Sequence, residues 1–172
     1  NMLKQAIQQG AETLAASSSD ANLEMLETLA AKIVDSLKNG GKVLLCGNGG
    51  SASQAQHISA EFVGRFKRER RGLASIALTT DTSILTAVAN DYGYEQIFSR
   101  QVESLGRAGD VLIGLSTSGN SGNVIRAVEL ALELGLTVAS FTGRKGGKLA
   151  SMVPLVFRAP SDDTSHIQET HI

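Results

Sequence analysis

Apolar residues recur every three or four positions along the first forty residues, which is the spacing of one face of an α-helix. Two helices are predicted here. The polar segment "SSSD" (17–20) separates them, with Asp20 as the N-cap of the second helix and Asn39–Gly40 at its end. The predicted apolar faces consist of Leu3, Ile7, Ala11 and Leu14 in the first helix and of Leu23, Leu26, Ala30, Ile33, Val34 and Leu37 in the second.

Beyond residue 41 the pattern changes to short apolar runs, which are predicted as buried strands at 42–46, 74–78, 111–116, 137–141 and 152–157. Helices are predicted around 51–66, 83–105, 120–134 and 146–151. This alternation predicts an α/β fold, a three-layer αβα sandwich around a five-stranded parallel sheet, with the active site at the carboxyl ends of the strands. We expect one domain over 1–172, with the N-terminal helices at 2–39 and the sheet and its helices at 42–172.

Composition adds the broad class of protein. A chain of 172 residues with 42% hydrophobic and 19% charged residues is typical of a globular protein. The formal net charge of −1 argues against a nucleic-acid partner held by general electrostatic attraction. No apolar run approaches the roughly 20 residues that span a bilayer, and residues 1–10 lack the layout of a signal peptide. With a single cysteine, Cys46, these features predict a cytoplasmic protein with no membrane partner.

Candidate chemistry begins with "CGNGGS" (46–51), a glycine loop between a predicted strand and a predicted helix. Backbone N–H groups at such a helix start bind anions. Gly47, Gly49 and Ala52 match the dinucleotide-binding spacing, but Asp81 lies farther along than the ribose-binding acid of that motif, which follows by about 20 residues. A tight structural turn is the alternative interpretation of this loop.

The helix after this loop carries an apolar and a polar stripe. The apolar stripe, predicted to face the core, consists of Ala55, Ile58, Phe62, Val63 and Phe66. Gln54, His57 and Glu61 form the polar stripe. Side chains four residues apart on a helix project side by side, so His57 and Glu61 could share a metal ion or a substrate proton. A solvent-facing pair is the alternative, because a zinc site needs three or more ligands.

A second loop, "STSGNS" (116–121), leads from another strand into a long helix. It brings four hydroxyls to the helix start, those of Ser116, Thr117, Ser118 and Ser121. Hydroxyls and free backbone amides suit a phosphate monoester, and four of them exceed what capping in a serine-rich turn requires. A dinucleotide would not need this second anion site, so the pattern favours a sugar phosphate as the ligand.

Four segments together resemble a known group of enzymes. "CGNGGSASQAQHISAEFVGRF" (46–66), "ALTTDTSILTAVANDYGYE" (77–95), "STSGNS" and "PSDDTSHIQETHI" (160–172) are similar to the phosphoheptose isomerases of the sugar isomerase (SIS) family, over essentially the whole chain after the first helix. The resemblance implies a SIS domain that converts sedoheptulose 7-phosphate to D-glycero-D-manno-heptose 7-phosphate through an enediol, the first step of ADP-heptose biosynthesis for the lipopolysaccharide core. It also implies a homotetramer with sites at subunit interfaces.

The same resemblance implies roles for individual residues. His57, Glu61 and Gln168 would bind one zinc ion per subunit, with Glu61 also the catalytic base. In the family the last helix supplies a further histidine ligand about two turns past the glutamine. This sequence stops at Ile172, before that position, so we expect the last helix to be cut short. The implied substrate contacts are Asn48, Gly49, Gly50, Glu61, Arg65, Asn90, Asp91, Ser116, Thr117, Ser118, Ser121 and Gln168.

Other functions remain open from the sequence. A non-catalytic SIS adaptor that binds the replication initiator DnaA would not need His57 and Glu61, and a nucleotide-dependent oxidoreductase would bind NAD. The basic run "RFKRERR" (65–71) could contact nucleic acid, but Glu69 interrupts it. A solvated helix end is the favoured interpretation of that run.

Overall fold

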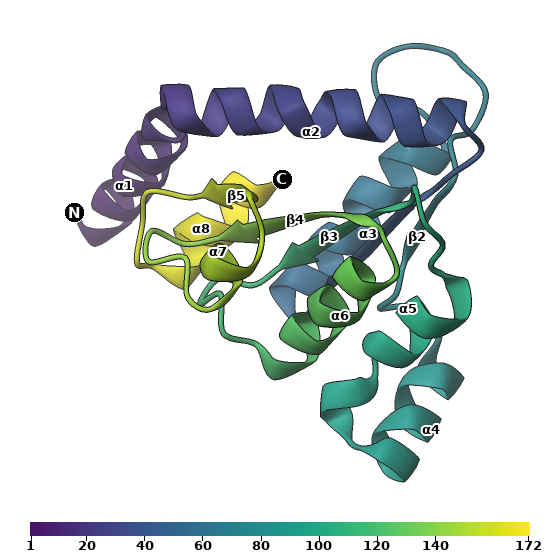
Figure 1. Ribbon diagram of the computed structural model, residues 1–172. Coiled ribbons are helices and arrows are strands. Elements are labelled where there is room, and N and C mark those ends of the chain that lie inside the picture. The colour runs from purple at the N-terminus through teal and green to yellow at the C-terminus, as the bar shows by residue number, and fades with distance from the viewer.

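A single parallel sheet forms the centre of the molecule, in a computed structural model that describes residues 1–172 (Figure 1). The strands are β1 (Val43–Gly47), β2 (Ser75–Ala77), β3 (Val111–Leu115), β4 (Thr137–Thr142) and β5 (Leu155–Arg158), in the order β2-β1-β3-β4-β5. Every neighbouring pair is parallel. The predicted five-stranded parallel sheet is therefore confirmed, although its last strand begins three residues later than expected.

Helices cover both faces of this sheet. The side chains of a strand alternate between the two faces, so Val43 and Leu45 of β1 join one core while Leu44 and Cys46 join the other. The first core is completed by α2 (Asp20–Lys38), α3 (Gly50–Val63) and α8 (Thr164–His171). The second is completed by α4 (Thr82–Tyr92), α5 (Ser99–Leu105), α6 (Gly122–Glu133) and α7 (Leu149–Met152). This is the predicted αβα sandwich.

Several predicted helix boundaries were wrong. The long helix expected over 83–105 is divided into α4, a 3-10 turn η1 (Tyr94–Gln96) and α5, because Gly93 takes a positive φ of 96° that ends α4. The helices expected at 120–134 and 146–151 are shorter and start later. Ser19, and not Asp20, is the N-cap of α2, since the Ser19 hydroxyl accepts the N–H of Asn22 at 3.3 Å.

Helix α3 ends earlier than its apolar stripe suggested. Gly64 follows its last residue, Val63, and both Val63 and Phe66 are exposed, in contrast to the prediction that they face the core. Ala55 is buried as expected, and Ile58 and Phe62 are partly buried against the same core. The last part of the predicted stripe is therefore available to other contacts.

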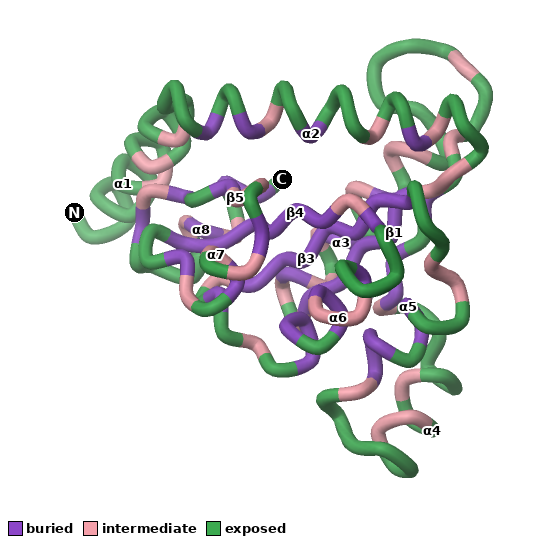
Figure 2. The backbone as a smooth tube through the Cα atoms, in the orientation of Figure 1, coloured by how far each residue is buried: buried purple, intermediate pink, exposed green.

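The two N-terminal helices leave much apolar surface uncovered. Helix α1 (Met2–Ala16) contains no buried residue, and it is exposed along nearly its whole length (Figure 2). On α2, Met25 and Leu29 are buried against the sheet, and the predicted core residues Leu26 and Ile33 are partly buried against the same core. The predicted core residues Leu23 and Val34 are exposed. The exposed apolar side chains of the pair are Met2, Leu3, Ile7, Leu14, Leu23 and Val34.

The single cysteine lies inside the sheet. Cys46 is fully buried in β1, and burial raises the pKa of its thiol to about 12, since the thiolate is disfavoured away from water. The thiol is therefore protonated and inert at neutral pH.

No helix in the structure combines the length and the apolar character needed to cross a membrane.

Candidate active site

The predicted site lies where the strand order changes direction. Strand β2 is added on one side of β1, whereas β3, β4 and β5 follow on the other side. Gly47, at the end of β1, stands opposite Leu115, at the end of β3. In open α/β sheets ligands bind outside the carboxyl ends of the strands at such a switch point. The loops after β1 and β3, which carry the two predicted ligand motifs, therefore lie side by side.

The glycine loop needs its glycines for close approach and for backbone conformation. A Cβ atom at Gly47 would stand 2.9 Å from the carbonyl oxygen of Leu115, and Gly49 takes a φ of 57° just before α3. Asp81 serves a different purpose from a ribose-binding acid. Its Oδ1 accepts the N–H of Ile84 at 2.9 Å and thereby caps α4.

Three hydroxyls of the serine loop converge before the start of α6. The Ser116 Oγ lies 2.8 Å from the Oγ of Ser121 and 3.5 Å from that of Ser118. Ser116 is buried, while Ser118 is open to solvent. We call these three residues the hydroxyl cradle. Its spacing allows all three oxygens to contact one phosphate group.

A neighbouring loop supports this cradle from behind. Gly119 takes a φ of 69°, and a Cβ atom there would collide with the carbonyl of Gly146. The Thr117 carbonyl accepts the N–H of Gly143 at 3.0 Å, so the fourth predicted phosphate residue is anchored through its backbone. The residues 143–147 that follow β4 thus fix the conformation of the loop, a role that the sequence did not indicate.

The side chain of Asn48 connects the glycine loop to two other segments. Its Nδ2 donates to the Oδ1 of Asn123 at 2.8 Å, and its Oδ1 accepts the Nδ2 of Asn123 at 2.8 Å and the hydroxyl of Tyr94 at 3.0 Å. Asn123 is in the first turn of α6 and is buried. Neither Asn123 nor Tyr94 was among the predicted site residues.

His57 and Glu61 lie side by side on α3, as their spacing predicted. The Nε2 of His57 is 3.3 Å from the Oε1 of Glu61, and their side chains are 59% and 34% exposed. A groove of about 370 Å³ opens beside the pair, and most of its walls are apolar. The lining residues are His57, Ile58, Glu61, Phe62, Phe66, Arg70, Leu73 and Ile172.

The end of this helix is held by Arg70. Its guanidinium donates to the carbonyls of Glu61 at 2.7 Å, Phe62 at 2.9 Å and Gly64 at 3.2 Å. These carbonyls lack partners within the helix, and a cation is favourable at a helix C-terminus. The interpretation of the basic run as a solvated helix end is therefore wrong for Arg70, which is half-buried, though Lys67 and Arg68 are exposed.

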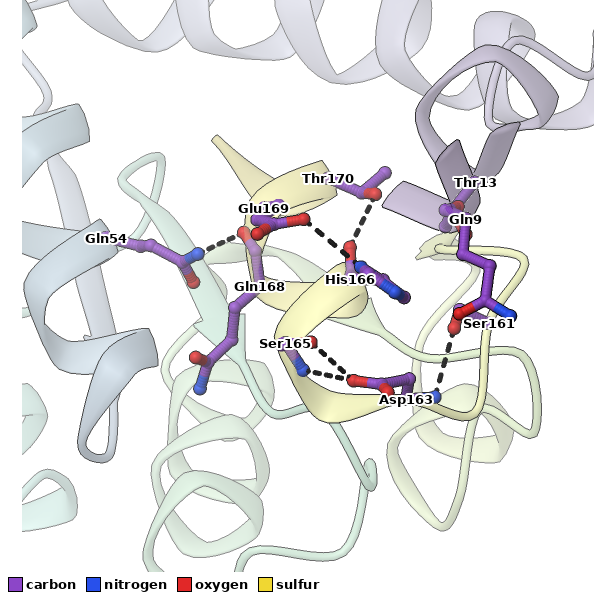
Figure 3. A network of polar contacts seen from close by, with 10 residues as sticks. All are labelled: Gln9, Thr13, Gln54, Ser161, Asp163, Ser165, His166, Gln168, Glu169 and Thr170. Carbon is purple, nitrogen blue, oxygen red and sulfur yellow. Dashed lines mark hydrogen bonds and ion pairs between the residues drawn. The ribbon is translucent and has the colours of Figure 1, made fainter. Parts of the chain in front are cut away.

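Gln168, on α8, lies against the first turns of α3. The backbone carbonyl of Gln168 accepts a hydrogen bond from Gln54, and its side-chain amide extends in another direction (Figure 3). This amide lies against Gly50. No three His, Cys, Asp or Glu side chains gather into a metal-binding group. His57 and Glu61 supply two of the three or more ligands that zinc requires, so a zinc site here would need a further donor such as the Gln168 amide.

The remaining predicted contacts are at the surface. Asn90 donates to the Oδ1 of Asp91 at 2.9 Å, and both side chains are exposed at the end of α4. Arg65 is exposed beyond the end of α3, with its Nε 3.3 Å from the Oε2 of Glu69. None of the three forms a hydrogen bond with the cradle or with Asn48.

Comparison with known proteins agrees with this architecture. The SIS domain family matches residues 4–143. A phosphoheptose isomerase of Helicobacter pylori (strain P12) is 57% identical over 149 residues, which make up 87% of this chain and 78% of that protein. The structure of the Neisseria gonorrhoeae phosphoheptose isomerase is similar with a TM-score of 0.88 at 46% identity, covering 100% of this chain and 93% of the other. The Francisella tularensis phosphoheptose isomerase gives a TM-score of 0.93 at 39% identity, covering 99% and 90%. The chain therefore belongs to the SIS domain family and is an isomerase of its phosphoheptose isomerase group.

Proposed function

We propose that this protein converts sedoheptulose 7-phosphate to D-glycero-D-manno-heptose 7-phosphate in the cytoplasm, the first step of ADP-heptose supply for the lipopolysaccharide core. The observation that carries the proposal is the hydroxyl cradle beside the glycine loop at the β1–β3 switch point, in a chain whose relatives are named phosphoheptose isomerases. The cradle suits the phosphate of a sugar phosphate, and the glycine loop suits its hydroxyl groups. No observation favours the DnaA-binding adaptor.

The reaction requires a base next to two adjacent carbons. The Glu61 carboxylate would remove a proton from C1 of the ketose while the C2 oxygen takes up a proton, which leaves a cis-enediol. The same carboxyl group, which can exchange its proton with solvent at this stage, would deliver a proton to C2 as the O1 hydroxyl loses one, and the aldose forms without any oxidant or reductant. The cradle would hold the phosphate, so that C1 and C2 meet the base in one orientation.

A second copy of the chain would complete the site. Glu61 follows Gly50 by eleven residues, which places it about 16 Å along α3 from the end of the helix that meets the cradle. The exposed apolar faces of α1 and α2 provide surface for association. We therefore propose a homotetramer in which the cradle of one subunit faces the His57–Glu61 pair of another.

We also propose that each subunit binds one zinc ion. His57 and Glu61 would be two of its ligands, and Gln168 would be a third. Bound zinc would polarise the oxygens on C1 and C2.

Incubation of the purified protein with sedoheptulose 7-phosphate in deuterium oxide tests this function. We expect an aldose 7-phosphate to appear by NMR with deuterium at C2, because the proton exchanges with solvent at the enediol stage. The absence of any aldose would overturn the proposal.

A further inference from the structure

A cluster of three polar side chains joins the three segments that are predicted to face the substrate. Asn48 comes from the glycine loop, Tyr94 from η1 just after Asn90 and Asp91, and Asn123 from the helix that follows the hydroxyl cradle. We call these three residues the amide cluster. Tyr94 and Asn123 lie 46 and 75 residues from Asn48 along the chain, so the fold brings the three together.

The bonds within the cluster use most of what the Asn48 side chain can offer. A carboxamide has two N–H donors and an oxygen that accepts two hydrogen bonds. In Asn48 the oxygen accepts from both Asn123 and Tyr94, and one N–H donates to Asn123. Only one N–H is left for a ligand. The Asn48 amide is therefore held mainly by the protein, and the backbone of the glycine loop is fixed with it.

Asn123 is the rigid end of this connection. It is 3% exposed, and its Oδ1 also accepts the N–H of Val124 at 2.9 Å in the first turn of α6. Loss of one partner in a buried amide pair leaves the other unsatisfied, which costs more than the hydrogen bond itself contributes. The pair thus ties the glycine loop to the helix that begins directly after the cradle, and it sets the distance between the two.

We propose that Asn123 and Tyr94 are positioning residues of the isomerisation, which act through Asn48 to fix the distance between the phosphate and the sugar hydroxyls that the glycine loop contacts. The proposal rests on the proposed function, and it makes the amide cluster a determinant of substrate length. A loop held at one distance from the cradle fits a sugar phosphate of one chain length. A loop free to move accepts shorter ones and aligns the correct one less well.

The variants Tyr94→Phe and Asn123→Ala test this directly. Tyr94 is exposed, so its variant loses a hydroxyl without a packing change, and Tyr92→Phe is the matched control because the Tyr92 ring stacks on Arg100 and its hydroxyl has no hydrogen bond. We expect kcat/KM to fall about two- to ten-fold in Tyr94→Phe, as for the loss of one hydrogen bond, and further in Asn123→Ala. The control variant Tyr92→Phe should have the same kcat/KM as the wild type.

The preference for a seven-carbon over a five-carbon substrate provides a second measurement, which general damage to the fold would not change. The affinities for sedoheptulose 7-phosphate, a five-carbon ketose phosphate and inorganic phosphate are measured by calorimetry. We expect the preference for seven over five carbons to narrow in both variants, with inorganic phosphate binding unchanged because the cradle is intact. The double variant should lose little more than Asn123→Ala alone, since both changes act through Asn48.

The outcomes separate this inference from the function on which it rests. A wild type that does not convert sedoheptulose 7-phosphate overturns the proposed function. A wild type that converts it, with both variants equal to the Tyr92→Phe control, overturns the role of the amide cluster alone. The role of the amide cluster would also be overturned if both variants kept the wild-type preference for substrate length, or if the losses of kcat/KM multiplied in the double variant.

Discussion

The side chain of Gln168 lies against the backbone of Gly50, and it leaves no room for a Cβ atom at position 50. The contact joins α8 to the first turn of α3, and the hydrogen bond from Gln54 to the Gln168 carbonyl reinforces it. Gln168 is therefore beside the glycine loop. Its predicted second role, as a zinc ligand, stays a prediction.

The zinc ligands can be tested by metal content. We expect one zinc ion per chain in the wild type and a loss of zinc affinity of more than about ten-fold in His57→Ala, because zinc needs three or more protein donors. His166→Ala is the matched control, since His166 forms a similar pair with Glu169 at 3.2 Å but is packed against α1. Elemental analysis after dialysis measures the zinc content of the wild type and of each variant. Equal zinc in wild type and His57→Ala would exclude His57 as a ligand.

The catalytic base can be tested by Glu61→Gln. The amide has the size of the carboxylate but cannot accept a proton, so we expect kcat to fall by at least about 10²–10⁴-fold while sugar-phosphate binding stays largely intact. Steady-state kinetics measure kcat, and calorimetry measures sugar-phosphate binding. Glu103→Gln, an exposed position paired with Arg100, is the control. Unchanged turnover in Glu61→Gln would rule out Glu61 as the base.

The hydroxyl cradle can be tested by Ser121→Ala. A hydrogen bond to a charged phosphate contributes about 1.5–3 kcal/mol, so we expect KM to rise about ten-fold or more, with a smaller change in kcat. Ser151→Ala removes a hydroxyl of α7 that bonds only to the Lys148 carbonyl, and it should change neither constant. A KM equal to the wild type in Ser121→Ala would place the phosphate elsewhere.

The exposed face of α1 can be tested by light scattering. Ile7 is 73% exposed in the single chain, and we expect Ile7→Asp to break the tetramer because it places a charge on an apolar contact. Gln8→Asp adds the same charge at a neighbouring exposed position and should leave the mass unchanged. If Ile7→Asp keeps the mass of the wild type, this face of α1 is not part of the interface.

Stability should depend on pH through His171. Burial lowers the pKa of this ring below 6.5, and the hydrogen bond of its Nε2 to the Thr142 carbonyl, at 3.0 Å, offsets part of the shift. As the pH falls below about 6.5, the unfolded chain binds a proton that the folded ring does not. The folded state is then destabilised relative to the unfolded chain.

Denaturant unfolding at pH 7.5 and 5.5 checks this dependence. His171→Gln keeps an N–H donor but does not titrate, so its loss of stability between the two pH values should be smaller than that of the wild type. His57 and His166 are present in both proteins and cancel in the comparison. Equal losses would show that His171 does not contribute.

The sheet and its layers could be predicted from the sequence because short apolar runs and glycine turns mark each strand. The orientation of α2 could not be predicted from the sequence. Its sequence carries apolar residues on more than one side, and only the packing against the sheet shows that Met25 and Leu29 are buried while Leu23 and Val34 are exposed. The break at Gly93 was missed because the residues on both sides of it are apolar at helical spacing.

The site was predictable where its residues are close in sequence. The His57–Glu61 pair and the three serines follow from spacing alone, since one helix or one loop positions each set. Asn123 and Tyr94 were missed because their partner, Asn48, is distant in the chain and an asparagine after a serine loop has no distinctive pattern. The side-chain direction of Gln168 depends on packing between α3 and α8, which no sequence motif encodes.

The sealed position of Cys46 has a practical consequence for labelling experiments. Because the thiol is fully buried, maleimide reagents have no native target on the folded protein. A cysteine introduced at any exposed position would therefore carry a fluorophore or spin label as the single modified residue, with the native Cys46 left in place. Distances between subunits could then be measured without first building a cysteine-free background.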